Sequence, residues 1–158
     1  MHQFSVSTFL LVCCLNSMLA SDGAFHVRGK LTCHGQPYAN ATVKLYEKNI
    51  IGRDTFLASE NTSKTGYFSM KSFASEWMGF SPNPYIYMVD YCEPHVYGSL
   101  KCGRTIKVFI PEPFIAKGPV PTNIFDIGEV ELPEISSEKY GFEIIVYSFF
   151  DQKECIST

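Results

Sequence analysis

Cysteine is the residue type in this sequence with the clearest capacity for chemistry. Of its six cysteines, Cys13 and Cys14 lie in an apolar N-terminal block. The remaining set is even, as expected for a protein whose cysteines pair in an oxidising compartment. That set comprises Cys33, Cys92, Cys102 and Cys155. We therefore predict two disulfides, although four cysteines allow more than one pairing.

A bridge between Cys92 and Cys102 is the pairing that we predict first. These cysteines bracket a polar loop, and closing about ten residues would stabilise the fold by about 3 kcal/mol. Cys33 and Cys155 would then pair by default and tie the end of the chain to the first strand. A zinc site of Cys92, His95 and Cys102 is the alternative, but no second close pair of ligands completes it. We expect no metal and no cofactor.

Catalysis by a nucleophile or by paired carboxylates is not indicated. A cysteine nucleophile needs a histidine base and a third orienting group, and nothing near His34 or His95 marks one out. Carboxylates at alternating strand positions normally point to solvent, and four fit that description: Asp90, Glu93, Glu129 and Glu131. We therefore predict that the protein is not an enzyme.

The N-terminus has the pattern of a secretory signal. The apolar block Phe9–Leu19 precedes the small residues Ala20 and Ser21, as in a signal peptide. The block is shorter than the roughly 20 apolar residues that cross a bilayer. We predict a signal peptide over residues 1–20, no transmembrane segment in the mature chain, and a secreted, extracellular protein.

Two N-glycosylation triplets agree with export. Asn40 is followed by Thr42, and Asn61 by Ser63, with no proline between them. Each triplet lies in a stretch of turn-like composition, where a glycan can point into solvent. We predict glycans at Asn40 and Asn61.

Length, charge and composition predict a single β domain. A chain of 158 residues with 46% hydrophobic residues has the size of one domain with one core. The net charge of −3 provides no attraction to a phosphate backbone, so nucleic acid is not an expected partner. Thirteen phenylalanines and nine tyrosines favour strands.

Alternation of apolar and polar residues predicts seven strands. In the first strand, Phe25 and Val27 lie on one face, and His26 and Arg28 on the other. Turn residues after the first and third strands predict two hairpins, one joining strands one and two and the other joining strands three and four. The predicted strands are Phe25–Cys33, Ala41–Tyr46, Phe56–Ser59, Tyr67–Phe73, Pro84–Cys92, Thr105–Ile110 and Phe125–Leu132.

These strands predict an all-β fold, a two-sheet antiparallel β-sandwich of seven or eight strands over residues 21–133. No helix long enough to connect parallel neighbours is evident, and Pro82 and Pro84 limit Ser75–Phe80 to a connector. Residues 134–158 form a C-terminal extension. Its apolar run Tyr140–Phe150 predicts an added edge strand.

The order and spacing of eight short segments resemble the nematode transthyretin-like family over Phe25–Leu132, about two-thirds of the chain. These segments are Gly29–Cys33, Gly35–Pro37, Val43–Leu45, Thr65–Phe68, Tyr91–Cys92, Cys102–Arg104, Ile110–Pro111 and Phe125–Gly128. The resemblance implies a secreted transthyretin-type sandwich with roles in extracellular binding or signalling. Asp90 stands where family members usually carry a histidine, so no role of that histidine is transferred.

The 5-hydroxyisourate hydrolases share this fold and provide the enzymatic alternative. They use a first-strand histidine and a terminal Tyr-Arg-Gly-Ser segment. Here the matching strand position is Arg28, and the chain ends in Glu154–Thr158 without that tetrapeptide. The hydrolase interpretation is therefore disfavoured.

We interpret the protein as an extracellular binding or adaptor module. Loops on a rigid scaffold carry function most often, so the polar residues around the predicted bridge are the first binding candidates: Glu93, His95, Lys101 and Arg104. The partner is an extracellular protein or a lipid. An alternative role as carrier of a small hydrophobic ligand or lipid is suggested by Tyr85, Tyr87 and Tyr91. The sequence leaves the oligomeric state open.

Overall fold

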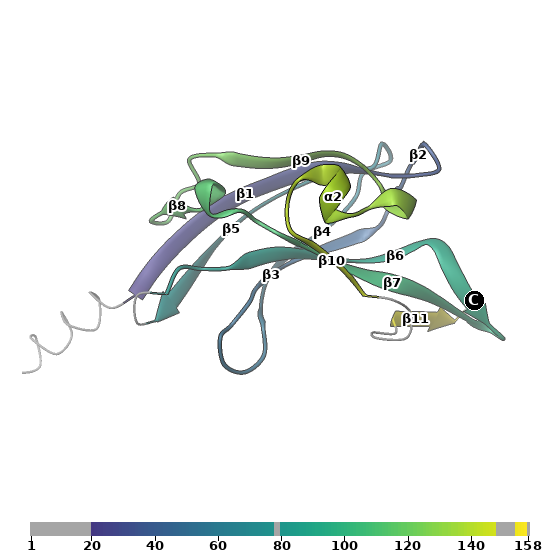
Figure 1. The fold of residues 1–158 in the computed structure, drawn as a ribbon, viewed down its shortest axis with the longest axis horizontal. Coiled ribbons are helices and arrows are strands. Elements are labelled where there is room, and N and C mark those ends of the chain that lie inside the picture. The colour runs from purple at the N-terminus through teal and green to yellow at the C-terminus, as the bar shows by residue number, and fades with distance from the viewer. Residues whose placement is uncertain (1–19, 78–79, 148–153, 158) are drawn as a thin grey trace, which may run out of the picture.

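The computed structural model describes residues 20–77, 80–147 and 154–157. Two sheets pack face to face (Figure 1). In the five-stranded sheet, β1 (Ala20–Cys33) pairs with β2 (Gln36–Pro37), β5 (Tyr67–Trp77), β8 (Ala116–Lys117) and β9 (Ile124–Glu131). The predicted signal peptide lies almost wholly outside the described residues.

The six-stranded sheet has the order β10–β7–β6–β3–β4, with β11 also paired to β7. Its strands are β3 (Thr42–Glu47), β4 (Thr55–Asn61), β6 (Pro84–Tyr97), β7 (Leu100–Phe109), β10 (Ile144–Tyr147) and β11 (Glu154–Ser157). The short helical segments are η1 (Glu112–Phe114), η2 (Leu132–Glu134) and α2 (Ser137–Tyr140). The two-sheet β-sandwich predicted from the sequence is therefore correct, and the apolar run of the tail forms β10 at the edge of this sheet.

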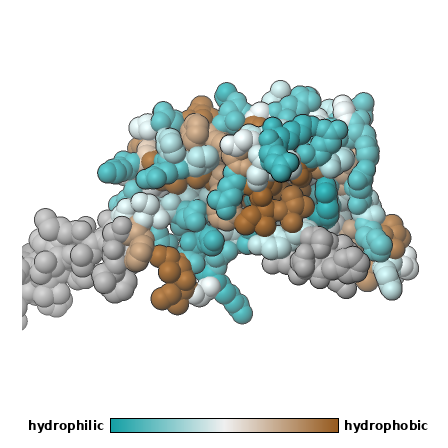
Figure 2. Space-filling view, in the orientation of Figure 1, coloured by the Kyte–Doolittle hydropathy of each residue, from teal (hydrophilic) through white to brown (hydrophobic). Residues whose placement is uncertain are grey.

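Alternating side chains from both sheets build one core. Leu31 in β1, Leu45 in β3 and Ile106 in β7 are fully buried, as is Ile86 in β6. In β3, for example, the buried Val43 and Leu45 alternate with the partly exposed Lys44 and Tyr46, as the two-residue period of a strand predicts. On the face in Figure 2, hydrophilic side chains predominate, and brown apolar areas appear in the centre, at the lower left and at the right-hand end.

Both predicted early hairpins are wrong. β1 and β3 lie in different sheets, because β2 folds back on the end of β1 before the chain crosses over. β4 pairs with β3, whereas β5 pairs with β1. β9 runs parallel to β1. The connection between these two parallel strands does not require a crossover helix, because the intervening chain passes through the other sheet. The segment predicted as a connector after Phe73 continues β5 to Trp77.

The core contains one carboxyl group without full hydrogen bonding. Glu47 at the end of β3 is 3% exposed. Its Oε1 accepts the Asn83 backbone N–H at 2.6 Å, whereas Oε2 has no partner among the described residues. Burial, and secondarily the nearby Glu76 and Asp54 carboxylates, raise the pKa of Glu47 to about 7.

This raised pKa predicts a pH-dependent stability. Between pH 4.5 and about 7, Glu47 keeps its proton in the folded state but has lost it in the unfolded state. The free energy of unfolding therefore falls as pH rises through this range, by up to about 3 kcal/mol. We expect Glu47→Gln, which has no charge to bury, to gain stability over the parent at pH 8 and little at pH 4.5. Urea denaturation at both pH values measures this, with exposed Glu143→Gln as the control. If Glu47→Gln changed the free energy of unfolding equally at both pH values, the raised pKa of Glu47 would be contradicted.

Candidate functional site

The hairpin of β6 and β7 projects from one end of the sandwich, at the right in Figure 1. A two-residue turn, Gly98–Ser99, joins the strands, and Gly98 has φ +58°, a value that glycine adopts easily. The pairing register shifts between Asp90 and His95. A Cβ at Gly103 would lie 2.6 Å from the Asp90 backbone oxygen, so glycine permits the close approach of β7 to this irregular part of β6.

The register shift explains why the predicted disulfides are wrong. Asp90 faces Arg104, so a regular ladder would place Cys92 opposite Cys102, but the shift puts His95 there instead. The structure pairs Cys33 with Cys92 and Cys102 with Cys155. The first bridge links the end of β1 to β6 and therefore joins the two sheets. The second joins β7 to β11, whose Cys155 lies directly opposite Cys102.

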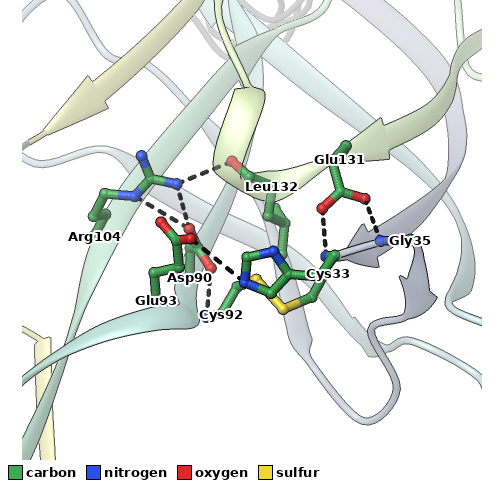
Figure 3. A network of polar contacts seen from close by, with 9 residues as sticks. Cys33, Gly35, Asp90, Cys92, Glu93, Arg104, Glu131 and Leu132 are labelled. Atoms are coloured by element: carbon green, nitrogen blue, oxygen red, sulfur yellow. Dashed lines mark hydrogen bonds and ion pairs between the residues drawn. A yellow bond between two sulfur atoms is a disulfide. The ribbon is translucent and has the colours of Figure 1, made fainter.

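An ion pair links the two strands of this hairpin, close to the inter-sheet disulfide (Figure 3). The Arg104 guanidinium donates to Asp90 Oδ2 at 2.6 Å and 3.1 Å, and it also donates to the Leu132 carbonyl at 2.9 Å. Asp90 Oδ1 accepts the Cys92 backbone N–H at 2.7 Å. The Asp90 side chain is fully buried, and that of Arg104 is 29% exposed. Arg104 thus connects β6 and β7 to the η2 segment that follows β9.

This pair overturns the expectation for Asp90 and adds a structural role to Arg104. Asp90 was expected to point to solvent, but it follows Ile86 and Met88 on the inward face of β6. Arg104 stays a predicted partner contact, and within the chain it donates hydrogen bonds to Asp90 and Leu132. Substitution of Arg104 therefore changes the stability of the fold, and it cannot serve as a test of partner binding alone.

A second polar cluster holds the turn after β1. The Glu131 carboxylate accepts hydrogen bonds from the backbone N–H groups of His34 and Gly35 and from the Thr32 hydroxyl. Burial acts to raise the pKa of Glu131, but these hydrogen bonds outweigh it and the net direction is downward. His34 adopts φ +52°, and its Nε2 lies 3.4 Å from Glu93 Oε1. Figure 3 shows Glu131 and Gly35 beside the Cys33–Cys92 bridge.

His34 and this bridge do not form a metal centre as they stand. The ligand atoms of Cys33, His34 and Cys92 lie within 4.8 Å of one another. Zinc binds cysteine as thiolate, however, and the two sulfurs here are bonded to each other. The predicted alternative of Cys92, His95 and Cys102 is likewise removed, because Cys92 and Cys102 belong to different disulfides.

The hairpin tip carries exposed apolar side chains that sequence reasoning overlooked. Val96 is 62% exposed, Tyr97 70% and Leu100 41%. We call these three residues the hairpin tip. All four predicted binding residues lie on the same hairpin: Glu93, His95 and Lys101 nearer the tip, and Arg104 farther along β7. The signal that could have revealed the tip is Gly98–Ser99, a dipeptide typical of two-residue hairpin turns, flanked by apolar residues.

A groove of about 400 Å³ lies on the outer face of the six-stranded sheet. Tyr87 and Tyr91 line it, whereas Tyr85 is only 3% exposed and donates to Asp54. Burial raises the pKa of Tyr91, and so does the Glu154 carboxylate. We call this site the tyrosine groove; its lining includes Tyr38, Asn40, Thr42, Tyr87, Tyr91 and Ile156.

Arg28, which occupies the position matched to the hydrolase histidine, forms an ion pair. Arg28 Nε donates to Asp126 Oδ2 at 2.7 Å, and both side chains are about half exposed. The Gly128 backbone N–H, and then Arg28, lower the pKa of Asp126. This pair is a surface ion pair joining β1 and β9, with no imidazole at the matched position.

The fold is a two-sheet β-sandwich whose sheets are joined by a disulfide. The model of the transthyretin-like family TTR-52 matches residues 28–111, which is more than half of the chain. Transthyretin-like protein 33 of Caenorhabditis elegans is 30% identical over 135 residues, covering 84% of this chain and 91% of that protein. Transthyretin-like protein 5 of the same organism is 33% identical over 127 residues, covering 78% and 88%. The chain belongs to the transthyretin-like family.

These relatives are named as transthyretin-like proteins, not as enzymes. No helix among residues 20–77, 80–147 and 154–157 is long and apolar enough to cross a membrane. The two disulfides are the form that cysteines take in an oxidising compartment. These features are compatible with an extracellular protein.

Proposed function

We propose that this protein is a secreted extracellular binding or adaptor module that contacts a protein partner through the hairpin tip. The observation that carries this proposal is the combination of exposed apolar residues with a rigid support. Val96, Tyr97 and Leu100 stand at the end of a hairpin whose two strands are each held by a disulfide, through Cys92 and Cys102.

The composition of this surface fits a protein interface. Interfaces have an apolar or aromatic centre and a polar rim, and tyrosine is enriched among the residues that dominate binding energy. Complete burial of an exposed aliphatic or aromatic side chain contributes about 1.5–3 kcal/mol. Glu93, His95 and Lys101 supply the polar rim on the same two strands. Because the hairpin is anchored, little conformational entropy is lost on binding.

A second candidate function is the transport of a small hydrophobic ligand or lipid. The tyrosine groove supports it, because its volume of about 400 Å³ falls within the range of small-molecule sites, about 300–1,000 Å³. The groove opens onto solvent, and the charged Lys44 is part of its lining, so it is more open and more polar than most carrier sites. We therefore place the adaptor function first.

The test compares two exposed tyrosines on opposite sheets. Tyr97 lies at the hairpin tip and Tyr67 on β5, with exposures of 70% and 58%. The full chain is secreted from animal cells, labelled, and applied to intact nematode tissue before and after protease treatment of the tissue surface. We expect Tyr97→Ser to reduce protease-sensitive binding about tenfold or more, equivalent to about 1.4 kcal/mol or more, while Tyr67→Ser binds as the parent does.

Three results would overturn the proposal. Equal losses with Tyr97→Ser and Tyr67→Ser would show that the hairpin tip is not the contact surface. Binding that survives protease treatment and is reproduced by phosphatidylcholine and phosphatidylserine vesicles would replace the protein partner with a lipid surface. Retention of the protein inside the producing cells would contradict secretion itself.

A further inference from the structure

One glycosylation triplet lies on the rim of the tyrosine groove. Asn40 and Thr42, the first and third residues of that triplet, both line the groove. Asn40 is exposed, has φ +59°, and is held by its backbone N–H, which donates to the Thr62 carbonyl at 3.0 Å. We propose that an N-linked glycan on Asn40 folds back into the tyrosine groove and covers Tyr87 and Tyr91. This inference rests on the secretion of the chain proposed above.

The chemistry of the groove suits a sugar. Tyrosine presents an apolar ring and a polar hydroxyl, which together match the C–H face and the hydroxyl groups of a saccharide. The Tyr87 hydroxyl donates to Glu154 Oε1 at 3.0 Å, so the ring is held in place. The Lys44 Nζ lies 5.9 Å from the centre of the same ring and provides donors for sugar hydroxyl groups.

The covalent tether makes weak binding sufficient. A group attached through a short flexible link has an effective concentration in the millimolar range. Even a contact with millimolar affinity, equivalent to about −4 kcal/mol, would therefore be substantially occupied. A free lipid or small molecule does not share this advantage. The anchored glycan is accordingly the occupant that we assign to the groove.

The second triplet provides a matched control within the same chain. Asn61 lies directly opposite Thr42 in the ladder of β3 and β4, and its Oδ1 accepts the Thr42 hydroxyl at 2.9 Å. Asn61 itself is not among the groove-lining residues. Aspartate preserves the size of asparagine, tolerates positive φ, and cannot carry the glycan. Asn40→Asp and Asn61→Asp therefore each remove one glycan and add the same charge.

The experiment uses the full chain secreted from animal cells. Glycopeptide mapping first establishes which asparagines are occupied, and chemical nitration then reports the accessibility of each tyrosine. We expect Asn40→Asp to increase nitration of Tyr87 and Tyr91 about twofold or more, as release of a tethered group that is bound at least half of the time requires. Asn61→Asp should leave both tyrosines as in the parent, and Tyr67, already exposed, should react equally in all three proteins.

A second readout follows the glycan itself. Tyr87→Ser should increase the rate at which peptide N-glycosidase releases the Asn40 glycan under native conditions, without changing the rate at Asn61. Unchanged nitration in Asn40→Asp, an unoccupied Asn40 in the secreted protein, or a lipid bound in the groove of the glycosylated parent would each overturn the inference. An unoccupied Asn40 in a secreted protein leaves the proposed secretion intact, whereas failure of secretion contradicts both.

Discussion

Replacing Arg104 with methionine is expected to lower the free energy of unfolding by about 3–5 kcal/mol, the usual cost of removing one partner from a buried ion pair. The Asp90 carboxylate is fully buried, and without Arg104 its Oδ2 loses both guanidinium hydrogen bonds. The Leu132 carbonyl loses a donor as well. Chemical denaturation at neutral pH measures this difference.

An exposed ion pair provides the control for this variant. Arg28 and Asp126 are paired at 2.7 Å with both side chains about half exposed, and such pairs contribute about 0–1 kcal/mol. Arg28→Met should therefore cost about 1 kcal/mol or less. Asp90→Asn introduced into Arg104→Met should restore part of the lost stability, because the amide oxygen can still accept the Cys92 N–H while the buried charge is gone. Equal losses for Arg104→Met and Arg28→Met contradict the structural role of Arg104.

Removal of the inter-sheet disulfide is the second change that we expect to lower the free energy of unfolding strongly. Cys33 and Cys92 are separated by 59 residues, and in the chain-entropy model a bridge over a loop of this length stabilises the fold by about 4 kcal/mol. The double variant Cys33→Ala/Cys92→Ala leaves no free thiol at the site and should lose stability of that order in thermal and urea unfolding.

The other disulfide spans a similar length of chain, 53 residues, but attaches the four-residue strand β11. Without this bridge the tail can detach while the two sheets remain packed. The native state then gains chain entropy too, which offsets part of the entropy that the unfolded state gains. We expect Cys102→Ala/Cys155→Ala to be less destabilising than Cys33→Ala/Cys92→Ala. A larger loss for the tail variant would show that the tail is part of the cooperative core.

Periodicity made the strands predictable but left their partners undetermined. Alternation shows which residues share a face, as for Phe25 and Val27 in β1, because the side-chain period of a strand is two. It carries no information about which strand lies alongside. The turn at His34–Pro37 therefore suggested a hairpin, although β2 ends there against β1 and the chain then enters the other sheet.

The same limit explains the errors at the candidate site. The register shift between Asp90 and His95 decides which residue faces Cys102, and no spacing in the sequence marks it. The burial of Asp90 could have been anticipated, because it continues the inward series of Ile86 and Met88. Carboxylates are rarely fully buried unless they are paired, and Arg104 is the partner that makes this burial possible.

The most direct test of hairpin-mediated binding is photo-crosslinking from the tip of the secreted, glycosylated full chain. A photoreactive residue is placed at position 97 and, in a parallel protein, at position 67 on β5, and crosslinked peptides from nematode surfaces are identified by mass spectrometry. The proposed function predicts that position 97 repeatedly captures peptides of one extracellular protein and that position 67 does not. Capture of the same protein from position 67 but not from position 97 would contradict it.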